Sequence, residues 1–421
     1  MYLAYLTSKA DHYLNKLCLD IPRRSVGSPG NRQATAFFAD VVASQGFQTE
    51  CPQFDCLYWT QDGARLAAED EAFQAFVSPY SLGCDVQAPL VAVSSLDELE
   101  SVQASGKLLL MRGELTREQL MPKNFPFYNP QEHQHIYHLL ELKNPLAIIT
   151  ATSRNPELAG ALYPFPLIED GDFDIPSVYL TEEVGDELLR FSGRPVSLTS
   201  LSRRIPATGC NVIASKNPAA ERRVVLTAHI DAKEGTPGAV DNAASVATLL
   251  LLAELLRDYS GKLGIEIVAI NGEDYYAAPG EVQYLQRNQG RLGDILLNIN
   301  LDGVGYHKGL TAYSLYECPE LVSGLVRQAW SGFPGMTEGE QWYQGDHMIF
   351  VQNQVPALAI TTDRFMEMET HIAHTAQDTP QLVNPARLST LALALRDLCL
   401  ALDSHFVSHN SHTLEPSSPI P

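Results

Sequence analysis

The 421-residue sequence predicts an α/β fold, with a mostly parallel central sheet covered by helices on both faces and a β-rich inserted domain. Continuous Val/Ile/Leu runs alternate with helical segments in the second half of the chain. Strands of this kind, buried on both faces, are typical of parallel sheets. The stretch 51–208 differs, with short β-like runs, loops and many prolines. We therefore expect a main domain at 1–50 and 209–406, an inserted domain at 51–208, and a polar tail at 407–421 that is disordered.

The elements follow in order along the chain. Two amphipathic helices are expected at about 2–17 and 31–45, the second ending before Gly46. Apolar runs predict the main strands at 222–228, 264–270, 295–301 and 357–361. Further helices are expected at 244–259, 319–330 and 384–406, with Asn384 as the N-cap of the last.

The amino-acid composition restricts which binding partners the protein can have and which cellular compartment it is expected in. The chain has 50 acidic and 29 basic residues, a net charge of −21, which argues against binding to nucleic acid or anionic membranes. No apolar run approaches the ~20 residues of a membrane span, and the N-terminus lacks the features of a signal peptide. Seven scattered cysteines without CxxC spacing predict free, mostly buried thiols. We expect a cytoplasmic protein; the alternative is an exported protein whose leader was removed.

Histidine and carboxylate residues collect where the predicted strands end. They are His229 and Asp231 after 222–228, Asp241 before the helix 244–259, Glu273 and Asp274 after 264–270, Asp302 after 295–301, and His374 and Asp378 downstream of 357–361. The carboxyl ends of parallel strands lie at one edge of a sheet, where open α/β sheets bind ligands. Any one of these acids alone is more often a helix cap than a ligand. Five segments at one edge favour a shared metal site.

The chemistry of this set suits a transition metal. Two imidazoles and several carboxylates, without thiolates, are ligands for Zn²⁺ or a neighbouring divalent ion. A pair of ions ~3.5–4 Å apart needs a bridging carboxylate, and one shared Asp with a His and a carboxylate for each ion satisfies this requirement. Asp231 follows His229 by two residues on an extended chain. We expect it to accept the second N–H of that imidazole.

The motifs occur in the order found in one known family. AHIDAKEGTPGAVDNAAS, NGED, NLDGVG, QGDHMIFVQNQVPALAI and HTAQDT, with the N-terminal RSVGSPGNRQATAFFADVVASQGF, resemble peptidase family M28. This two-zinc aminopeptidase family also includes glutamate carboxypeptidases and glutaminyl cyclases. The resemblance covers about 1–50 and 209–406, and it implies the zinc-exopeptidase fold, of the phosphorylase/hydrolase-like type.

Residue by residue, the resemblance implies a two-zinc hydrolase that removes N-terminal residues from peptide substrates. Asp241 would bridge the ions, His229 and Asp302 would hold one, and Asp274 and His374 the other. Glu273 would be the general base. Co²⁺ or Mn²⁺ could replace zinc, because Asp274 stands where the family usually has Glu.

A second departure concerns the oxyanion. Ala373 occupies a place where some members carry an oxyanion-stabilising Tyr. Tyr343 and His371 are the candidates to contact the oxyanion or the substrate instead.

The inserted stretch resembles a protease-associated domain in GKLLLMRG (106–113), NPLAIIT (144–150) and DIPSVYLTEEVGDELL (174–189). In relatives such an insert limits access to the site, which implies a preference for short peptides. The stretch also holds His133, His135 and His138. Without accompanying carboxylates they are expected to lie on a solvated helix face.

Other functions stay open at this point. A serine hydrolase and a zincin are disfavoured, because the chain lacks both G-x-S-x-G and H-E-x-x-H. Within the family, the alternatives are a glutaminyl-cyclase-like transferase with one zinc, and a carboxypeptidase or dipeptidase. A metal-free receptor or scaffold is the non-enzymatic alternative. Such a descendant would be expected to lose ligands or the base, whereas all these positions are filled here.

Overall fold

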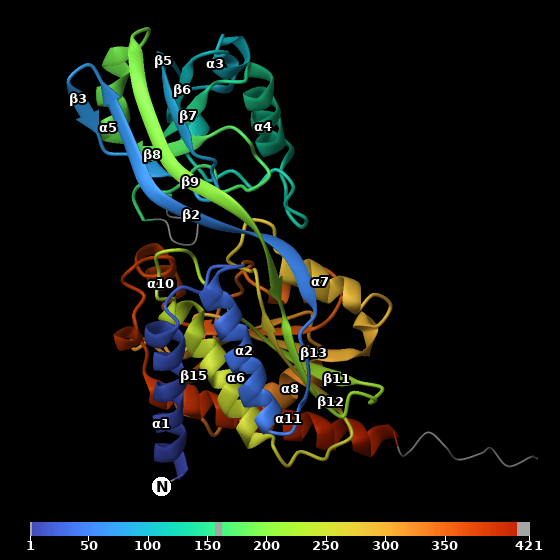
Figure 1. The fold of residues 1–421 in the computed structure, drawn as a ribbon. Coiled ribbons are helices and arrows are strands. Elements are labelled where there is room, and N and C mark those ends of the chain that lie inside the picture. Colours follow the sequence, from blue (N-terminus) through green and yellow to red (C-terminus); the bar gives the residue numbers. More distant parts are fainter. Residues whose placement is uncertain (1, 156–161, 411–421) are drawn as a thin grey trace, which may run out of the picture.

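The chain forms two lobes, one above the other in Figure 1, each with its own eight-stranded sheet. The structure is a computed structural model that describes residues 2–155 and 162–410. Two long strands, β2 (Gln53–Ala68) and β9 (Pro195–Cys210), pair antiparallel and run from one lobe into the other. The stretch between β2 and β9 builds the upper lobe, and the segments before and after it build the lower lobe.

The sheet of the lower lobe has four parallel strands at its centre. Its order is β1 (Gln48–Glu50), β10 (Val212–Lys216), β12 (Gly264–Ile270), β11 (Arg223–His229), β13 (Ile295–Leu301), β16 (Ala357–Thr362), β14 (Thr311–Tyr316) and β15 (Met336–Glu338). Strands β12, β11, β13 and β16 are parallel. Antiparallel pairs lie on either side, β1–β10 and β10–β12 on one and β16–β14 on the other. The four predicted strands are thus present, each within one residue of its expected ends, and flanking antiparallel strands make the sheet mixed.

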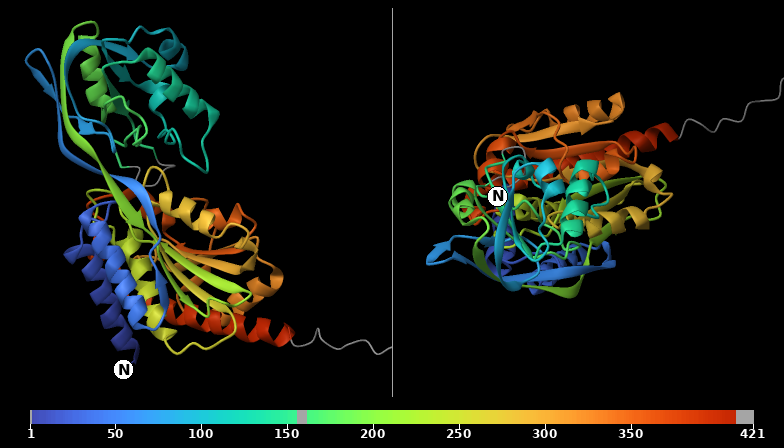
Figure 2. Two further views of the ribbon diagram at one scale, coloured as in Figure 1. Left: turned by 45° about the vertical axis from the view of Figure 1, so that its right-hand side comes forward. Right: turned by 90° about the horizontal axis from the view of Figure 1, so that it is seen from above.

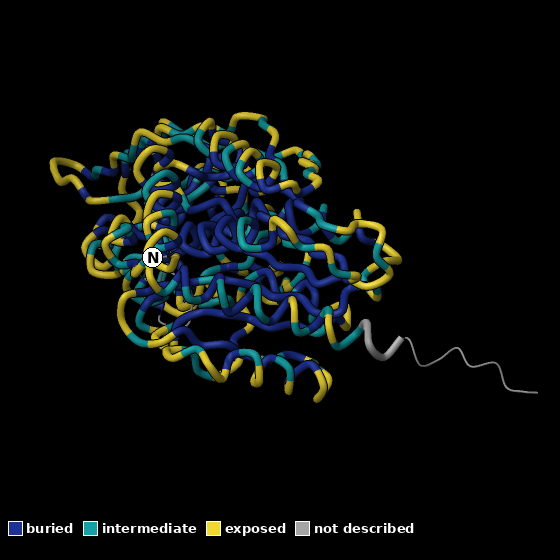
Figure 3. The backbone as a smooth tube through the Cα atoms, turned by 90° about the horizontal axis from the view of Figure 1, so that it is seen from below, coloured by how far each residue is buried: buried dark blue, intermediate teal, exposed yellow. Residues whose placement is uncertain are grey.

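Helices cover both faces of this sheet. One apolar core joins the first face to α1 (Tyr2–Asn15), α2 (Pro29–Ser44), α6 (Ala244–Leu255), α8 (Glu320–Trp330) and α11 (Pro385–Asn410). The second face packs against α7 (Pro279–Arg287) and α9 (His347–Val351). The central strands are buried along their length (Figure 3), as their apolar sequences require. Helix α10 (Phe365–His371) follows β16.

The upper lobe carries the second sheet. Its order is β3 (Glu71–Phe73), β2, β9, β5 (Cys84–Val93), β6 (Leu108–Met111), β7 (Ala147–Thr152), β8 (Ser177–Thr181) and β4 (Phe76–Val77). The helices α3 (Leu96–Ser101), α4 (Gln131–Lys143) and α5 (Glu182–Leu188) accompany it. Two further views show this lobe standing over one end of the lower sheet (Figure 2). The insert thus contains β-structure, as expected, together with helices.

Helix ends agree closely with the capping signals. The side chain of Ser28 accepts the Asn31 N–H at the start of α2, and the chain turns at Gly46 with φ +73°. Asn384 accepts the Ala386 N–H at 3.1 Å, as expected of the N-cap of α11. That helix extends to Asn410, so the expectation of a disordered tail from 407 was wrong for its first four residues. The remainder, 411–421, lies outside the described residues.

Three smaller expectations can be compared with the structure. All seven cysteines are free, but only Cys18 and Cys399 are buried, so the expectation that most thiols are buried was wrong. His135 and His138 are exposed, whereas His133 is buried and accepts the Met121 N–H at 3.0 Å. Within 2–155 and 162–410, no helix has the length and hydrophobicity needed to cross a bilayer.

Candidate metal centre

The carboxyl ends of the central strands bring the predicted residues to one edge of the lower sheet. His229 is the last residue of β11 and pairs in register with Ile270, the last of β12. Glu273 and Asp274 follow β12 directly, and Asp302 follows β13, where its N–H donates to Ile360 O of β16 at 2.9 Å. The parallel arrangement of these strands therefore places side chains that are far apart in sequence next to one another.

Asp241 lies between the two histidines and presents one oxygen to each. Its Oδ1 is 3.0 Å from Nε2 of His229, and its Oδ2 is 3.1 Å from Nε2 of His374. Asp378 positions this stretch of backbone, because its two carboxylate oxygens accept the Val240 and Asp241 N–H groups at 2.7 and 3.0 Å. The arrangement is that of a carboxylate that can bridge two cations.

His374 completes the second half of the cluster. Its Nε2 is 2.8 Å from Oδ1 of Asp274, while on the other side Nε2 of His229 is 3.8 Å from Oδ1 of Asp302. His374 has φ +61°, a left-handed conformation that costs a non-glycine residue about 1–3 kcal/mol and is concentrated at functional sites. Asp241 thus has one histidine and one further carboxylate on each side.

The spacing of these atoms fits metal ligation. Tetrahedral zinc with bonds of about 2.0–2.1 Å places two ligand atoms about 3.3–3.5 Å apart, and the four N···O separations in the cluster range from 2.8 to 3.8 Å. Both ring nitrogens of His229 and Oδ2 of Asp274 are buried without a hydrogen-bond partner among the described residues. Buried polar atoms without partners are costly unless an ion or a water molecule satisfies them. The donor set therefore fits divalent cations.

The electrostatics of the cluster lead to the same conclusion. Burial opposes ionisation of Asp241, but the two histidines outweigh it and hold the pKa of that carboxyl below its usual range. Burial raises the pKa of Glu273 well above its usual value; His229 opposes the rise, and the carboxylates of Asp274 and Asp302 add to it. Several acids so close together repel one another, and positive charge is needed to hold all of them ionised.

Asp231 has a different partner from the one expected. Its Oδ1 is 3.8 Å from Nδ1 of His229, too far for the predicted hydrogen bond. Instead, the two oxygens of Asp231 accept the N–H groups of Gly272 and Asp274 at 2.8 and 3.1 Å. Asp231 therefore fixes the backbone that carries Glu273 and Asp274, because the tight turn after β12 directs those N–H groups toward it.

The two proposed oxyanion residues lie on the surface. Tyr343 is 66% exposed, and its hydroxyl donates to Gln341. His371 is exposed, and its Nδ1 lies 3.1 Å from the guanidinium of Arg154 in the upper lobe. Both side chains thus have contacts with residues outside the cluster.

Acidic residues around the centre were given no role in the sequence analysis. Asp378 positions Asp241, as described above. Asp346 is buried next to the cluster; burial, followed by the charge of Glu281, raises its pKa well above the usual value. Burial, followed by Asp241, raises the pKa of Glu369 to about 8. Asp378 and Asp346 stand within the quoted motifs HTAQDT and QGDHMIFVQNQVPALAI, whereas Glu369 lies in none of the quoted motifs.

Arg24 holds the loop that leads to Asp241. Its buried guanidinium donates to the carbonyl oxygens of Leu17, Ile230, Pro237 and Gly238 at 2.8 to 3.2 Å. We expect Arg24→Met to lower the free energy of unfolding by about 3–5 kcal/mol, because four carbonyl oxygens, three of them in buried hydrogen bonds, lose their donor. Urea unfolding measures this effect. Arg23→Met is the matched control, since Arg23 is exposed, and an equal loss in both variants would contradict the assigned role.

Comparison with known proteins supports the family resemblance. Residues 211–399, from β10 into α11, match the model of peptidase family M28. Residues 211–399 are therefore similar in sequence to peptidase family M28. The resemblance seen in the sequence motifs is thereby confirmed, and the matched segment contains all five ligand-type residues and Glu273.

Proteins similar to this chain have names that describe different activities. The chain is 27% identical over 227 residues to the glutaminyl-peptide cyclotransferase of Drosophila melanogaster, covering 44% of this chain and 63% of that protein. The aminopeptidase from Aneurinibacillus sp. strain AM-1 has a TM-score of 0.72 at 21% identity, covering 94% of this chain and 93% of the other. BSAP, a zinc aminopeptidase from Bacillus subtilis, has a TM-score of 0.71 at 18% identity, covering 98% and 96%. At such identities the two structures show a shared fold, which extends over both lobes.

Proposed function

We propose that this protein is a zinc-dependent aminopeptidase with two ions in its active site. The observation that carries the proposal is the position of Asp241, with one carboxylate oxygen 3.0 Å from His229 and the other 3.1 Å from His374. A single-ion site does not require a carboxylate shared between two histidines. The zinc aminopeptidase fold of the neighbours supports the choice of metal and reaction.

The cluster divides into two ligand sets. His229 and Asp302 would hold one ion, His374 and Asp274 the other, and Asp241 would contact both. When bound, the two ions supply Lewis acidity to the peptide carbonyl and lower the pKa of a nearby water. Asp378 and Asp231 hold the backbone of the bridging carboxylate and of the 272–274 turn, so the ligands are positioned before a substrate enters.

Glu273 is the residue that we propose for proton transfer. Its carboxylate lies 4.0 Å from Nε2 of His229 and is partly accessible, with 22% of the side chain exposed. It is therefore beside the proposed ligands without replacing any of them. Glu273 would accept a proton from the attacking water and later donate it to the leaving amine, as a general base that then acts as an acid.

Removal of metal tests the proposal directly. We expect a zinc chelator to lower the rate of leucine p-nitroanilide and dipeptide hydrolysis by about a hundredfold or more, because the ions provide the main electrostatic activation. Added Zn²⁺ should restore it, and Co²⁺ and Mn²⁺ report the metal preference. Full activity after complete metal removal, verified by elemental analysis, would contradict the metal mechanism.

The end of the peptide that is attacked needs its own measurement. An aminopeptidase shortens a peptide with an amidated C-terminus and leaves an N-acetylated peptide intact, and mass spectrometry of both digests shows which occurs. The opposite pattern would identify a carboxypeptidase. Hydrolysis confined to dipeptides would identify a dipeptidase.

Glutaminyl cyclisation is the second candidate, favoured by the similarity to the Drosophila cyclotransferase. A peptide with N-terminal glutamine separates the two activities. Hydrolysis releases free glutamine, whereas cyclisation releases ammonia and leaves a pyroglutamyl peptide. We expect hydrolysis, because ligand-type residues are present on both sides of Asp241.

A further inference from the structure

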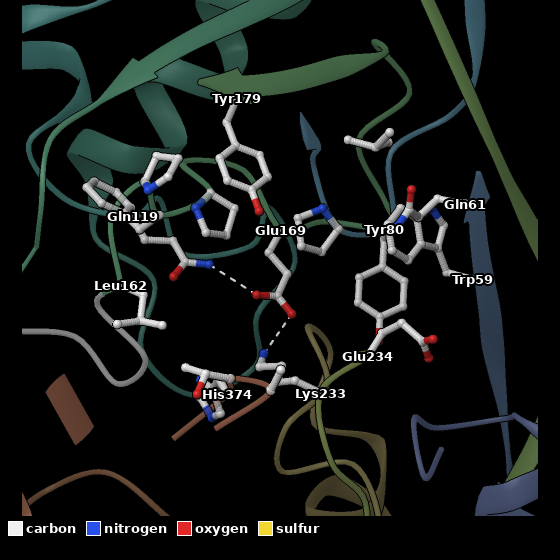
Figure 4. A pocket seen from close by; sticks show the side chains of 17 residues that line it. Trp59, Gln61, Tyr80, Gln119, Leu162, Glu169, Tyr179, Lys233, Glu234 and His374 are labelled. Carbon is white, nitrogen blue, oxygen red and sulfur yellow. Dashed lines mark hydrogen bonds and ion pairs between the residues drawn. The ribbon is translucent and has the colours of Figure 1, made fainter. Parts of the chain in front are cut away.

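A cavity of about 400 Å³ lies between the two lobes, beside the proposed active site (Figure 4). His374, one of the proposed metal ligands, forms part of its lining, and aromatic side chains such as Trp59, Tyr80 and Tyr179 come from the upper lobe. Its size is in the range of small-molecule sites, which is enough for one or two amino-acid residues. A substrate held at the metal centre can therefore extend into this cavity.

Lys233 places a positive charge inside this cavity. It belongs to the loop after β11, and 24% of its side chain is exposed. Its Nζ donates to Oε1 of Glu169 in the upper lobe at 2.6 Å, which is its one hydrogen-bond partner among the described residues. An ammonium group has three N–H donors. Two of them have no acceptor among the described residues and can bind one in the cavity.

The two acidic residues of the cavity, Glu169 and Glu234, already accept hydrogen bonds from other side chains. Oε1 of Glu169 accepts from Lys233, and its Oε2 accepts from Gln119 at 3.2 Å, so each oxygen has a donor. Glu234, the other acid of the cavity, is exposed, and its Oε2 already accepts the Ser25 hydroxyl at 2.9 Å. Among the described residues that line the cavity, Lys233 is the one lysine or arginine, so a substrate carboxylate that enters the cavity meets this ammonium group.

We propose that Lys233 is a specificity residue that binds a carboxylate of the substrate. The proposal rests on the proposed peptidase function and names its substrate class. A carboxylate can reach this cavity from two sources, the side chain of an acidic N-terminal residue or the free C-terminus of a dipeptide. The aromatic walls pack against the apolar part of either substrate, and Lys233 forms a charge-assisted hydrogen bond with the carboxylate.

Substitutions of the two members of the ion pair give opposite expectations. Lys233→Met keeps most of the volume of the side chain and removes the cation, so selectivity for carboxylates should fall. Glu169→Gln keeps its shape and removes the anion that competes for Lys233, so selectivity should rise. If the ion pair only held the lobes together, both substitutions would change the hydrolysis of all substrates in the same direction.

Two pairs of substrates measure this selectivity. Leu-Ala as the free acid against Leu-Ala amide tests the C-terminal source, and glutamyl against glutaminyl p-nitroanilide tests the side-chain source. For each pair we compare two values of kcat/KM, and the readout is the value for the substrate with the carboxylate divided by the value for its neutral counterpart. In the pair that uses Lys233, we expect Lys233→Met to lower the ratio by about tenfold, mainly through KM, and Glu169→Gln to raise it by about threefold.

Control variants make the result decisive. Lys233→Arg should keep most of the ratio, because the charge and donors remain. Lys216→Met is the matched control, since Lys216 lies at the opposite end of the sheet, paired with Ile265 at the start of β12, and donates to Arg257 O. It should leave both ratios unchanged. The proposal for Lys233 is overturned if the protein hydrolyses peptides but Lys233→Met leaves both ratios unchanged. It is also overturned if Lys233→Met and Glu169→Gln change the ratio in the same direction. Either result leaves the proposed peptidase function in place. If no peptide or anilide is hydrolysed by the metal-loaded protein, the proposed function itself fails.

Discussion

Glu273→Gln is expected to lower kcat for peptide hydrolysis by about a thousandfold, within the usual range for loss of a general base. The amide keeps the size of the carboxyl group but cannot accept the proton of the attacking water. Because Glu273 stands beside the proposed ligands, 4.0 Å from His229, the variant should bind as much zinc as the wild type. Steady-state kinetics, combined with elemental analysis of the same sample, measures both quantities.

Glu320→Gln is the control for this variant, because that carboxylate lies in the first turn of α8 with 93% of its side chain exposed. It should have wild-type kinetics. A Glu273→Gln enzyme that retains most of its activity would show that another group transfers the proton. Loss of zinc from Glu273→Gln would instead show that Glu273 is a ligand.

Asp241→Asn is expected to abolish activity and to remove most of the bound metal. A neutral amide has one ligating oxygen where the carboxylate presents two, and it brings no negative charge to two cations. We expect kcat/KM to fall by about ten-thousandfold, since both ions and their electrostatic activation are lost together. Metal content after gel filtration and activity in excess zinc measure the effect.

The folded state of Asp241→Asn should persist, because Asp378 binds the backbone N–H groups of this loop and does not depend on the Asp241 side chain. Circular dichroism checks this point. Asp258→Asn, at an exposed position, is the control and should keep its metal and activity. If Asp241→Asn kept one tightly bound ion and substantial activity, Asp241 would not be the bridge between two ions.

The sequence contains enough information to predict the centre of the fold and the positions of the cluster. Four apolar runs predict β11, β12, β13 and β16, because strands buried on both faces need continuous hydrophobic sequence. Their ends then place His229, Glu273, Asp274 and Asp302 at one edge. His374 and Asp241 lie outside the strands; their positions along the chain included them in the predicted cluster, and the resemblance to the family implied their separate roles.

The remaining features depend on contacts between distant segments. β14 was not predicted, since Ser314 and the tyrosines in its sequence interrupt an aliphatic pattern, and Tyr313 is buried against Trp330 of α8. The predicted hydrogen bond between Asp231 and His229 was wrong. The turn at Gly272, with φ +120°, instead brings backbone N–H groups within hydrogen-bond distance of the Asp231 carboxylate. Glu169 has no local signal at all. Its pairing with Lys233 exists only because the upper lobe folds over the lower one.

The central claim is that Asp241 bridges two metal ions, and anomalous X-ray diffraction at the zinc edge from crystals of the zinc-loaded protein tests it most directly. We expect two anomalous peaks, one beside His229 and Asp302 and the other beside His374 and Asp274, with the Asp241 carboxylate in contact with both. One peak, or two peaks that do not share Asp241, would contradict the account.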